Sequence, residues 1–217
     1  MKILAFDTST DLLTAGLYKE GKVLAEERSS GFARHSDLLM PLLKKLFKTA
    51  CLKPGEVDLI AVGLGPGSFT GLRVGLAAAK ILGFVGGKKI VGIPSFLTLA
   101  ASQEMEGTVA VLADAKRNKL YAWVGSGRKT ELTELKKILP KIPRGTAVLT
   151  SVLLDPSSRE LLEKKSCRVL SEPKPISAFH ASRIALSMAQ KKQFTAPENL
   201  KPLYLYPKDC NVTQKKK

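Results

Sequence analysis

Two short stretches of the chain have residue types and spacing that could bind a phosphate group. The first, residues 63–75, reads GLGPGSFTGLRVG, a glycine-rich turn directly before a helical pattern. Amide groups at a helix start bind anions, and Ser68, Thr70 and Arg73 would add donors. The P-loop pattern requires a lysine that this loop lacks, and the dinucleotide pattern requires a glycine where Thr70 stands. The loop therefore predicts either weak phosphate contact or a tight turn shaped by its glycines and Pro66.

The second stretch, LAFDTST, ends a predicted strand at Asp7 and continues into a hydroxyl-rich turn with Thr8. In phosphotransferases of the actin and sugar-kinase type, a carboxylate in this position orients a magnesium ion while the turn faces the phosphates. Asp114 ends a later predicted strand and is either a second carboxylate for such a site or a loop residue. The same pattern also fits an Asp7 that only caps a turn.

Other patterns that carry catalysis are few. His35 and His180 lie far apart and form no H-x-x-x-H pair, and the sequence has no G-x-S-x-G motif. Cys51, Cys167 and Cys210 are widely spaced and form no C-x-x-C pair. The sequence therefore indicates neither a zinc site nor a disulfide framework, and it offers no nucleophile and base for a peptidase.

Hydrophobic patterning predicts the elements that must position these residues. Three strands in an antiparallel meander are indicated by KILAFDTS, LTAGLYKEG and KVLAEERSS. Residues 36–48 then predict a helix, followed by a strand in EVDLIAVGLG, a helix in TGLRVGLAAAKILGFV and a strand in KIVGIPS. Strand-helix-strand alternation adds parallel strands to the meander and predicts an α/β fold.

The strand pattern restarts near Gly107. A second hairpin is predicted in TVAVLADAK and KLYAWVGS, and a later helix in ISAFHASRIALSMAQKK. The ending NLKPLYLYPKD has the pattern of a terminal strand or of a tail packed over the surface. We expect one domain over residues 1–106 and a second over 107–217, with the C-terminal segment packing back.

The helix that follows the glycine-rich loop carries a stripe of small residues. Gly71, Gly75, Ala79 and Gly83 recur every four residues and share one helix face. Glycine inside a helix costs about 1 kcal/mol relative to alanine, so the stripe indicates close approach by another backbone. Because the helix over 36–48 is rich in leucine, we favour a partner protein over internal packing. A bulky residue at Gly75 or Ala79 would then block the partner and leave the chain folded.

The charge of the chain is strongly positive and unevenly distributed. The sequence has 35 Lys+Arg and 19 Asp+Glu, a net charge of +16, and residues 116–217 hold 22 of the basic and 8 of the acidic residues. This half is either a surface for nucleic acid or a solvated, lysine-rich face. Lys80 interrupts the longest apolar run, and the N-terminus has no signal-like segment, so we expect a cytoplasmic protein without membrane contact.

Six segments together resemble the bacterial TsaB family, also called YeaZ. They are ILAFDTST, HSDLLMPLLKKL, GLGPGSFTGLRVGLAAAKILG, GIPSFLTLA, LADAKRNKLYAW and KPLYLY, and GPGSFTGLR is the most specific of them. The resemblance covers residues 1 to about 124 and returns at the C-terminal PLYL. It implies the actin-like ATPase fold, an RNase-H-like (ASKHA) architecture of two related subdomains.

The resemblance also implies a function. The family acts in making threonylcarbamoyladenosine beside the anticodon of tRNAs that read codons beginning with A. In that family TsaB is not the catalyst: it binds and activates TsaD, the metal-containing transferase, and the ATPase TsaE joins them. TsaB docks through N-terminal helices that correspond to residues 36–48 and 71–84. The residues expected at this interface are Leu38, Leu39, Leu42, Gly71, Leu72, Gly75, Ala78, Ala79 and Leu82.

The implied partners are TsaD and TsaE, a second copy of the chain when it is alone, and tRNA through the complex or through the basic second half. No firmly bound cofactor or metal is implied, and ATP or ADP with magnesium would bind only weakly or within the complex. The expected phosphate contacts are Asp7, Thr8, Ser68, Thr70 and Arg73.

The chain departs from the family at three positions. Where the family has D-A-R and then a Glu shortly before Tyr, this chain has Lys116 and Lys119, and Tyr206 replaces the Arg after the terminal P-x-Y-L. These changes make nucleotide binding less expected. Two other functions stay open at this point: an ATP-binding phosphotransferase that uses Asp7, Thr8 and the glycine loop, and a peptidase, which has the weakest support.

Overall fold

The chain folds into two compact units. The computed structural model describes residues 1–30, 35–125, 129–150, 154–170 and 172–206. The first unit consists of residues 1–102 and 175–203, and the second of residues 103–174 and the segment from Tyr204. The first boundary lies near the expected one at residue 106, but residues 175–203, which were expected in the second domain, belong to the first unit. An apolar helix face is buried where a matching sheet face exists, and sequence spacing alone does not reveal which sheet that is.

The first unit is built on one five-stranded sheet in the order β3-β2-β1-β4-β5. β1 (Lys2–Asp7), β2 (Leu12–Lys19) and β3 (Lys22–Ser30) form the predicted antiparallel meander. β4 (Leu59–Gly63) and β5 (Lys89–Ile93) extend it in parallel with β1. The strand predictions for this half of the chain are confirmed.

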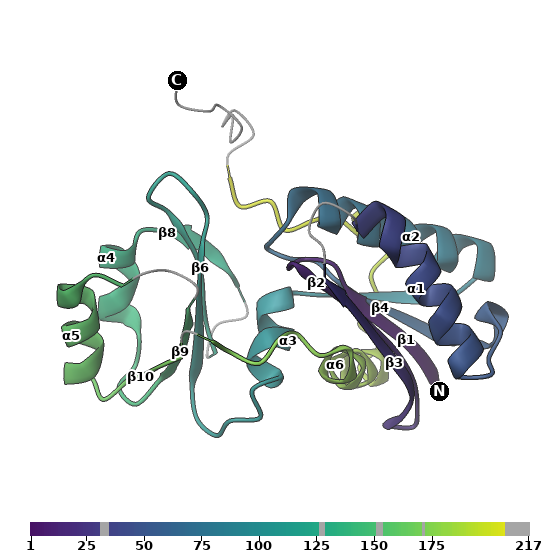
Figure 1. Cartoon of the computed structure of the whole chain (residues 1–217), viewed down its shortest axis with the longest axis horizontal. Coiled ribbons are helices and arrows are strands. Elements are labelled where there is room, and N and C mark those ends of the chain that lie inside the picture. The colour runs from purple at the N-terminus through teal and green to yellow at the C-terminus, as the bar shows by residue number, and fades with distance from the viewer. Residues whose placement is uncertain (31–34, 126–128, 151–153, 171, 207–217) are drawn as a thin grey trace. The chain divides into compact units, whose positions relative to one another are not determined.

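Helices cover both faces of this sheet (Figure 1). α1 (His35–Thr49) and α2 (Phe69–Gly86) lie on one face, where Leu4 and Phe6 of β1 point. α6 (Ala178–Gln190) lies on the other, against Ile3 and Ala5. The alternation of β1 side chains thus supplies both cores, as expected for a strand buried on two faces.

Three short helical segments complete the first unit. α3 (Ser95–Ala101) follows β5, η2 (Pro54–Glu56) precedes β4, and η4 (Pro197–Asn199) lies near the C-terminal end of the described chain. Residues 201–206 form no strand, so of the two alternatives predicted for this segment the structure shows the tail.

The second unit repeats the strand order of the first. Its sheet has the order β10-β9-β6-β7-β8, with β6 (Val109–Asp114), β7 (Leu120–Val124) and β8 (Glu131–Thr133) in an antiparallel meander. β9 (Ala147–Thr150) and β10 (Arg168–Leu170) add on the other side of β6 in parallel. α4 (Leu135–Ile138), η3 (Leu139–Lys141) and α5 (Pro156–Lys164) complete it. The two units are therefore related, as the sequence resemblance implied.

One helix of the described chain, α2, is long and apolar enough to cross a membrane by length and composition. Its inward side chains, including Leu72, Leu76 and Ala79, belong to the core of the first unit. Its apolar character is therefore divided between a buried face and an exposed face.

Candidate functional site

The glycine-rich loop closes over the turn between β1 and β2. The amide of Ser68 donates to the carbonyl of Ser9 at 2.8 Å, and a Cβ atom at Gly67 would overlap that carbonyl. The amide of Gly65 donates to the hydroxyl of Ser95 at 3.0 Å, and Gly65 has a φ of +85°, which favours glycine. Two of the amides that a phosphate would need are thus bonded to the chain itself.

Asp7, at the end of β1, is buried beneath this loop with 2% of its surface exposed. One carboxylate oxygen accepts from the amide of Ser9 and the other from the hydroxyl of Ser95, each at 2.7 Å. A Cβ atom at Gly63 would overlap the carboxylate, so β4 passes directly against it. Burial raises the pKa of Asp7 above its ordinary value, although these hydrogen bonds act in the opposite direction. Asp7 does not face an open site for a magnesium ion.

The small-residue stripe of α2 is explained by the same turn. The hydroxyl of Thr8 donates to the carbonyl of Gly71 at 2.8 Å, and a Cβ atom at Gly75 would overlap that hydroxyl. A Cβ atom at Gly83 would lie 2.6 Å from the side chain of Ile90. The close approach that the stripe requires is therefore supplied by the chain itself, and the expectation of a partner there is corrected.

The other expected phosphate contacts lie at the start of α2, next to the turn that carries Thr8. Ser68 caps α2 by accepting from the amide of Gly71 at 3.1 Å, and Thr70 is exposed. The guanidinium of Arg73 stacks 3.8 Å from the centre of the Phe69 ring. Asp7 and Thr8 are buried beside these residues, and their side chains are hydrogen-bonded within the chain.

Most residues expected at the partner interface are interior. Those that are buried are Leu39, Leu42, Gly71, Leu72, Gly75 and Ala79. Those that are partly buried are Leu38, Ala78 and Leu82. α1 and α2 pack against each other and the sheet, so most of the leucine side chains of α1 are buried within the unit.

Four large side chains of α2 point outward instead. Ile81, Phe84 and Val85 are 63%, 84% and 80% exposed, and Phe69 is also exposed at the start of the helix. We call these four residues the α2 outer face. Sequence reasoning missed them, although the spacing of Ile81, Phe84 and Val85 places them away from the glycine stripe. Because Ala79 and Gly83 face the core, the large side chains on the opposite side of this end of the helix face solvent or a partner.

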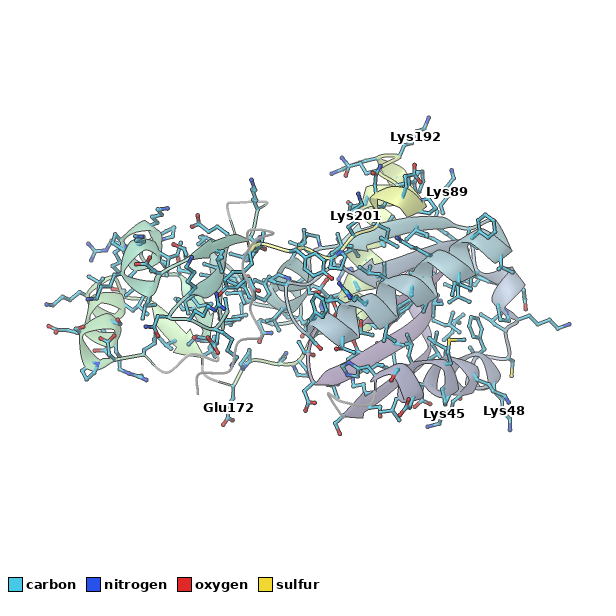
Figure 2. The ribbon with its side chains drawn as sticks, turned by 90° about the horizontal axis from the view of Figure 1, so that it is seen from above. Lys45, Lys48, Lys89, Glu172, Lys192 and Lys201 are labelled. Carbon is cyan, nitrogen blue, oxygen red and sulfur yellow. The ribbon has the colours of Figure 1, made fainter. Side chains whose placement is uncertain are left out.

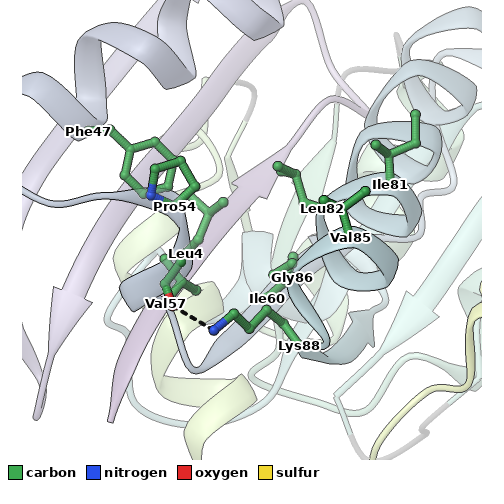
Figure 3. A pocket seen from close by; sticks show the side chains of 11 residues that line it. Leu4, Phe47, Pro54, Val57, Ile60, Ile81, Leu82, Val85, Gly86 and Lys88 are labelled. Carbon is green, nitrogen blue, oxygen red and sulfur yellow. Dashed lines mark hydrogen bonds between the residues drawn. The ribbon is translucent and has the colours of Figure 1, made fainter.

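A cavity of about 290 Å³ adjoins the α2 outer face (Figure 3). Ile81 and Val85 line it from α2, and Phe47 and Pro54 line it from the end of α1 and from η2. Its remaining lining residues are Leu4, Gly55, Val57, Ile60, Leu82, Gly86 and Lys88. Lys88 donates its ammonium to the carbonyl of Gly55 at 2.6 Å and so ties the end of α2 to η2. The lining is almost entirely apolar and suits an apolar side chain.

The second candidate carboxylate, Asp114, is the last residue of β6 and pairs with Leu120 of β7. It accepts from the amide and the ammonium of Lys116 at 2.8 and 2.7 Å, which holds its pKa below the ordinary value. The hydroxyl of Tyr206 donates to the carbonyls of Ala115 and Lys116 at 2.7 and 3.0 Å. Asp114 therefore ends β6, as predicted, and fixes the turn that follows it, and Tyr206, which departs from the family pattern, holds the same turn. Over the described ranges, no three His, Cys, Asp or Glu side chains are grouped so as to hold a metal ion.

The burial of Asp7 predicts a pH dependence of stability. Because its folded pKa is raised, its contribution is fully present below the unfolded pKa and is lost as the pH rises through the folded pKa. Asn cannot ionise, so the free energy of unfolding of Asp7→Asn minus that of the wild type should increase between about pH 4 and pH 8. Urea unfolding of both proteins across this range measures the trend. If the difference in the free energy of unfolding stayed constant or decreased, burial would not raise the pKa of Asp7.

Two α/β units that repeat one strand order define the class of actin-like ATPase folds. A ROK hexokinase from Thermus thermophilus has this fold and matches with a TM-score of 0.50 and 11% identity, over 88% of this chain and all of that chain. YeaZ from Pseudomonas aeruginosa matches with a TM-score of 0.77 and 19% identity, over 94% of this chain and all of that one. Both likenesses concern the fold.

The family follows from the sequence. Residues 22–191 match the family model described as "TsaD: tRNA N6-adenosine threonylcarbamoyltransferase". A Bacillus subtilis tRNA threonylcarbamoyladenosine biosynthesis protein TsaB is 35% identical over 122 residues, which are 56% of this chain and 53% of that protein. The chain belongs to this family and, within it, to the TsaB (YeaZ) group. It spans about half the length of the curated relatives that it matches.

Proposed function

We propose that this chain is the partner subunit that binds and activates the transferase TsaD when threonylcarbamoyladenosine is formed beside the anticodon of tRNA, and that it does not catalyse the transfer itself. The proposal rests on family membership and on one structural observation, the α2 outer face. A role on tRNA assigns the chain to the cytoplasm. TsaE would join the pair, and a second copy of the chain would cover the same face when TsaD is absent.

Exposed apolar side chains favour docking for an energetic reason. Full burial of one Val, Ile or Phe side chain is worth about 1.5–3 kcal/mol, and three of them lie together at the end of α2. Contiguous apolar patches on folded proteins commonly mark interaction sites. The adjoining cavity could receive one apolar anchor from TsaD, as buried anchors do at the centre of other interfaces.

The alternative of a phosphotransferase loses support from the same geometry. Such an enzyme would need the Asp7 carboxylate and the loop amides to face the nucleotide, and both are bonded within the chain. No observation favours a peptidase.

Sedimentation of the chain with purified TsaD tests the proposal. We expect the chain alone to form a homodimer and the mixture to form a heteromeric species in its place, because one face serves both contacts. Separate sedimentation of the two proteins at all concentrations tested would reject the docking role.

A further inference from the structure

Exposed lysines gather along the outer edge of β5, the last strand of the first sheet. Lys89 begins this strand, Lys191 and Lys192 follow the end of α6, and Lys201 follows η4. In Figure 2, Lys89, Lys192 and Lys201 project from one edge of the first unit, while Lys45 and Lys48 project from the opposite edge. We call these four lysines, together with the exposed Phe194, the β5-edge cluster.

Hydrogen bonds fix this cluster to the sheet. The amide of Thr195 donates to the carbonyl of Ile90 at 2.8 Å, and the amide of Gly92 donates to the Thr195 hydroxyl at 3.0 Å. Farther along, the amide of Leu203 donates to the carbonyl of Leu64 at 2.9 Å. The segment that carries Lys192 and Lys201 is therefore held against the strand that carries Lys89.

The charges of the cluster are not balanced by acidic partners. Over the described residues, the ion pairs use seven other lysines, which are Lys2, Lys45, Lys116, Lys137, Lys141, Lys164 and Lys174. Between residues 191 and 201 the only acidic residue is Glu198. Four like charges on one edge repel one another, and an anionic ligand would relieve that repulsion.

An aromatic ring lies among these charges. The ammonium of Lys89 is 4.3 Å from the centre of the Phe194 ring, and 37% of the Phe194 surface is exposed. Lysine ammonium groups contact phosphates as point charges, and exposed aromatic rings stack with unpaired bases. Lysines beside such a ring fit a nucleic acid better than an acidic peptide or a lipid headgroup.

We propose that the β5-edge cluster binds the sugar-phosphate backbone of tRNA directly, with Phe194 against an unpaired base. This inference rests on the proposed function, which supplies tRNA as the substrate of the complex. The charge distribution of the sequence pointed to the second half of the chain as a surface for nucleic acid. Three of these lysines lie in that half of the sequence, but all four belong to the first unit of the structure.

Fluorescence anisotropy with an unmodified, labelled tRNA transcript and the full chain tests the proposal. The cluster variant replaces Lys89, Lys191, Lys192 and Lys201 by Gln. The control variant replaces Lys19, Lys22, Lys44 and Lys48 by Gln, which removes the same charge from exposed lysines elsewhere on the first unit. Each phosphate contact contributes about 0.7–0.9 to the slope of log affinity against log salt, so the cluster variant should lose about 3 from this slope and the control less than about 1.

A second variant tests the aromatic contact without changing charge. Phe194→Leu should weaken tRNA binding about 5-fold to 150-fold, the range expected for the loss of one stacked base, with an unchanged salt slope. Circular dichroism confirms that each variant is folded. If the quadruple variant does not fold, the double variant Lys192→Gln with Lys201→Gln replaces it, and its salt slope should decrease by about half as much.

Three results would overturn the proposal. They are equal losses in the cluster and control variants, no tRNA binding by the wild type at low salt, and binding to phosphatidylglycerol vesicles with none to tRNA. TsaD binding by the cluster variant, measured without RNA, should equal that of the wild type. If the wild-type chain binds tRNA but not TsaD, only the proposed function is rejected. If it binds TsaD but not tRNA, only this inference is rejected.

Discussion

Replacing Gly75 by Ala is expected to destabilise the chain by about 2 kcal/mol, which lowers Tm by roughly 4–8 °C for a chain of this size. The added methyl group would overlap the hydroxyl of Thr8, which donates to the carbonyl of Gly71. Overpacking a core costs about 1–3 kcal/mol, and the displaced hydrogen bond adds about 1 kcal/mol. The better helix propensity of Ala offsets about 1 kcal/mol of this cost. Thermal and urea unfolding measure the change.

Gly86→Ala is the matched control on the same helix. Gly86 is exposed, and the three atoms nearest to a Cβ atom there all belong to the flexible side chain of Lys88, the first at 3.0 Å. The stability of this variant should be unchanged or slightly raised. Equal effects at the two positions would mean that α2 does not pack on the turn at Thr8. The structure also contradicts the expectation that a bulky Gly75 variant would stay folded and only lose its partner.

Phe84→Glu together with Val85→Glu is expected to weaken binding to TsaD about 100-fold or more. Both side chains are mostly exposed in the isolated chain, so the free energy of unfolding should change by less than about 0.5 kcal/mol per site. In a docked complex the charges would be buried without partners, and truncation of central interface residues alone costs 2 kcal/mol or more. Isothermal calorimetry with TsaD measures the loss.

Val23→Glu controls for a nonspecific effect of added charge. Val23 is an exposed apolar residue on β3, away from α2 in the sheet order. The Val23→Glu variant should bind TsaD as the wild type does. If the α2 variant retains wild-type affinity, the α2 outer face is not the docking surface.

The strand framework could be predicted because local patterns determine it. The alternation of β1, β2 and β3 and the restart at β6 follow from periodicity, and the repeated strand order bears out the two related units. The assignment of α6 to the first sheet depends on contacts with residues far away in the sequence, and its own periodicity shows only that one face is apolar.

The candidate site was harder to predict, because it depends on which face of α2 packs against the rest of the first unit. The glycine spacing at Gly71 and Gly75 correctly indicated close backbone approach, but it did not indicate that Thr8, more than sixty residues earlier, is the neighbour. The exposed Phe84 and Val85 follow once the glycine face is known to be internal. The burial of Asp7 depends on Ser95 and Gly63, which sequence spacing does not bring together.

Reconstitution of the modification tests the central claim most directly. Threonylcarbamoyladenosine on an unmodified tRNA transcript would be quantified by mass spectrometry after incubation with TsaD, TsaE, ATP and the threonylcarbamoyl donor. We predict abundant product when the wild-type chain is added, and little product when it is omitted or carries Phe84→Glu and Val85→Glu. Equal product with and without the chain, or product formed by the chain without TsaD, would contradict the account.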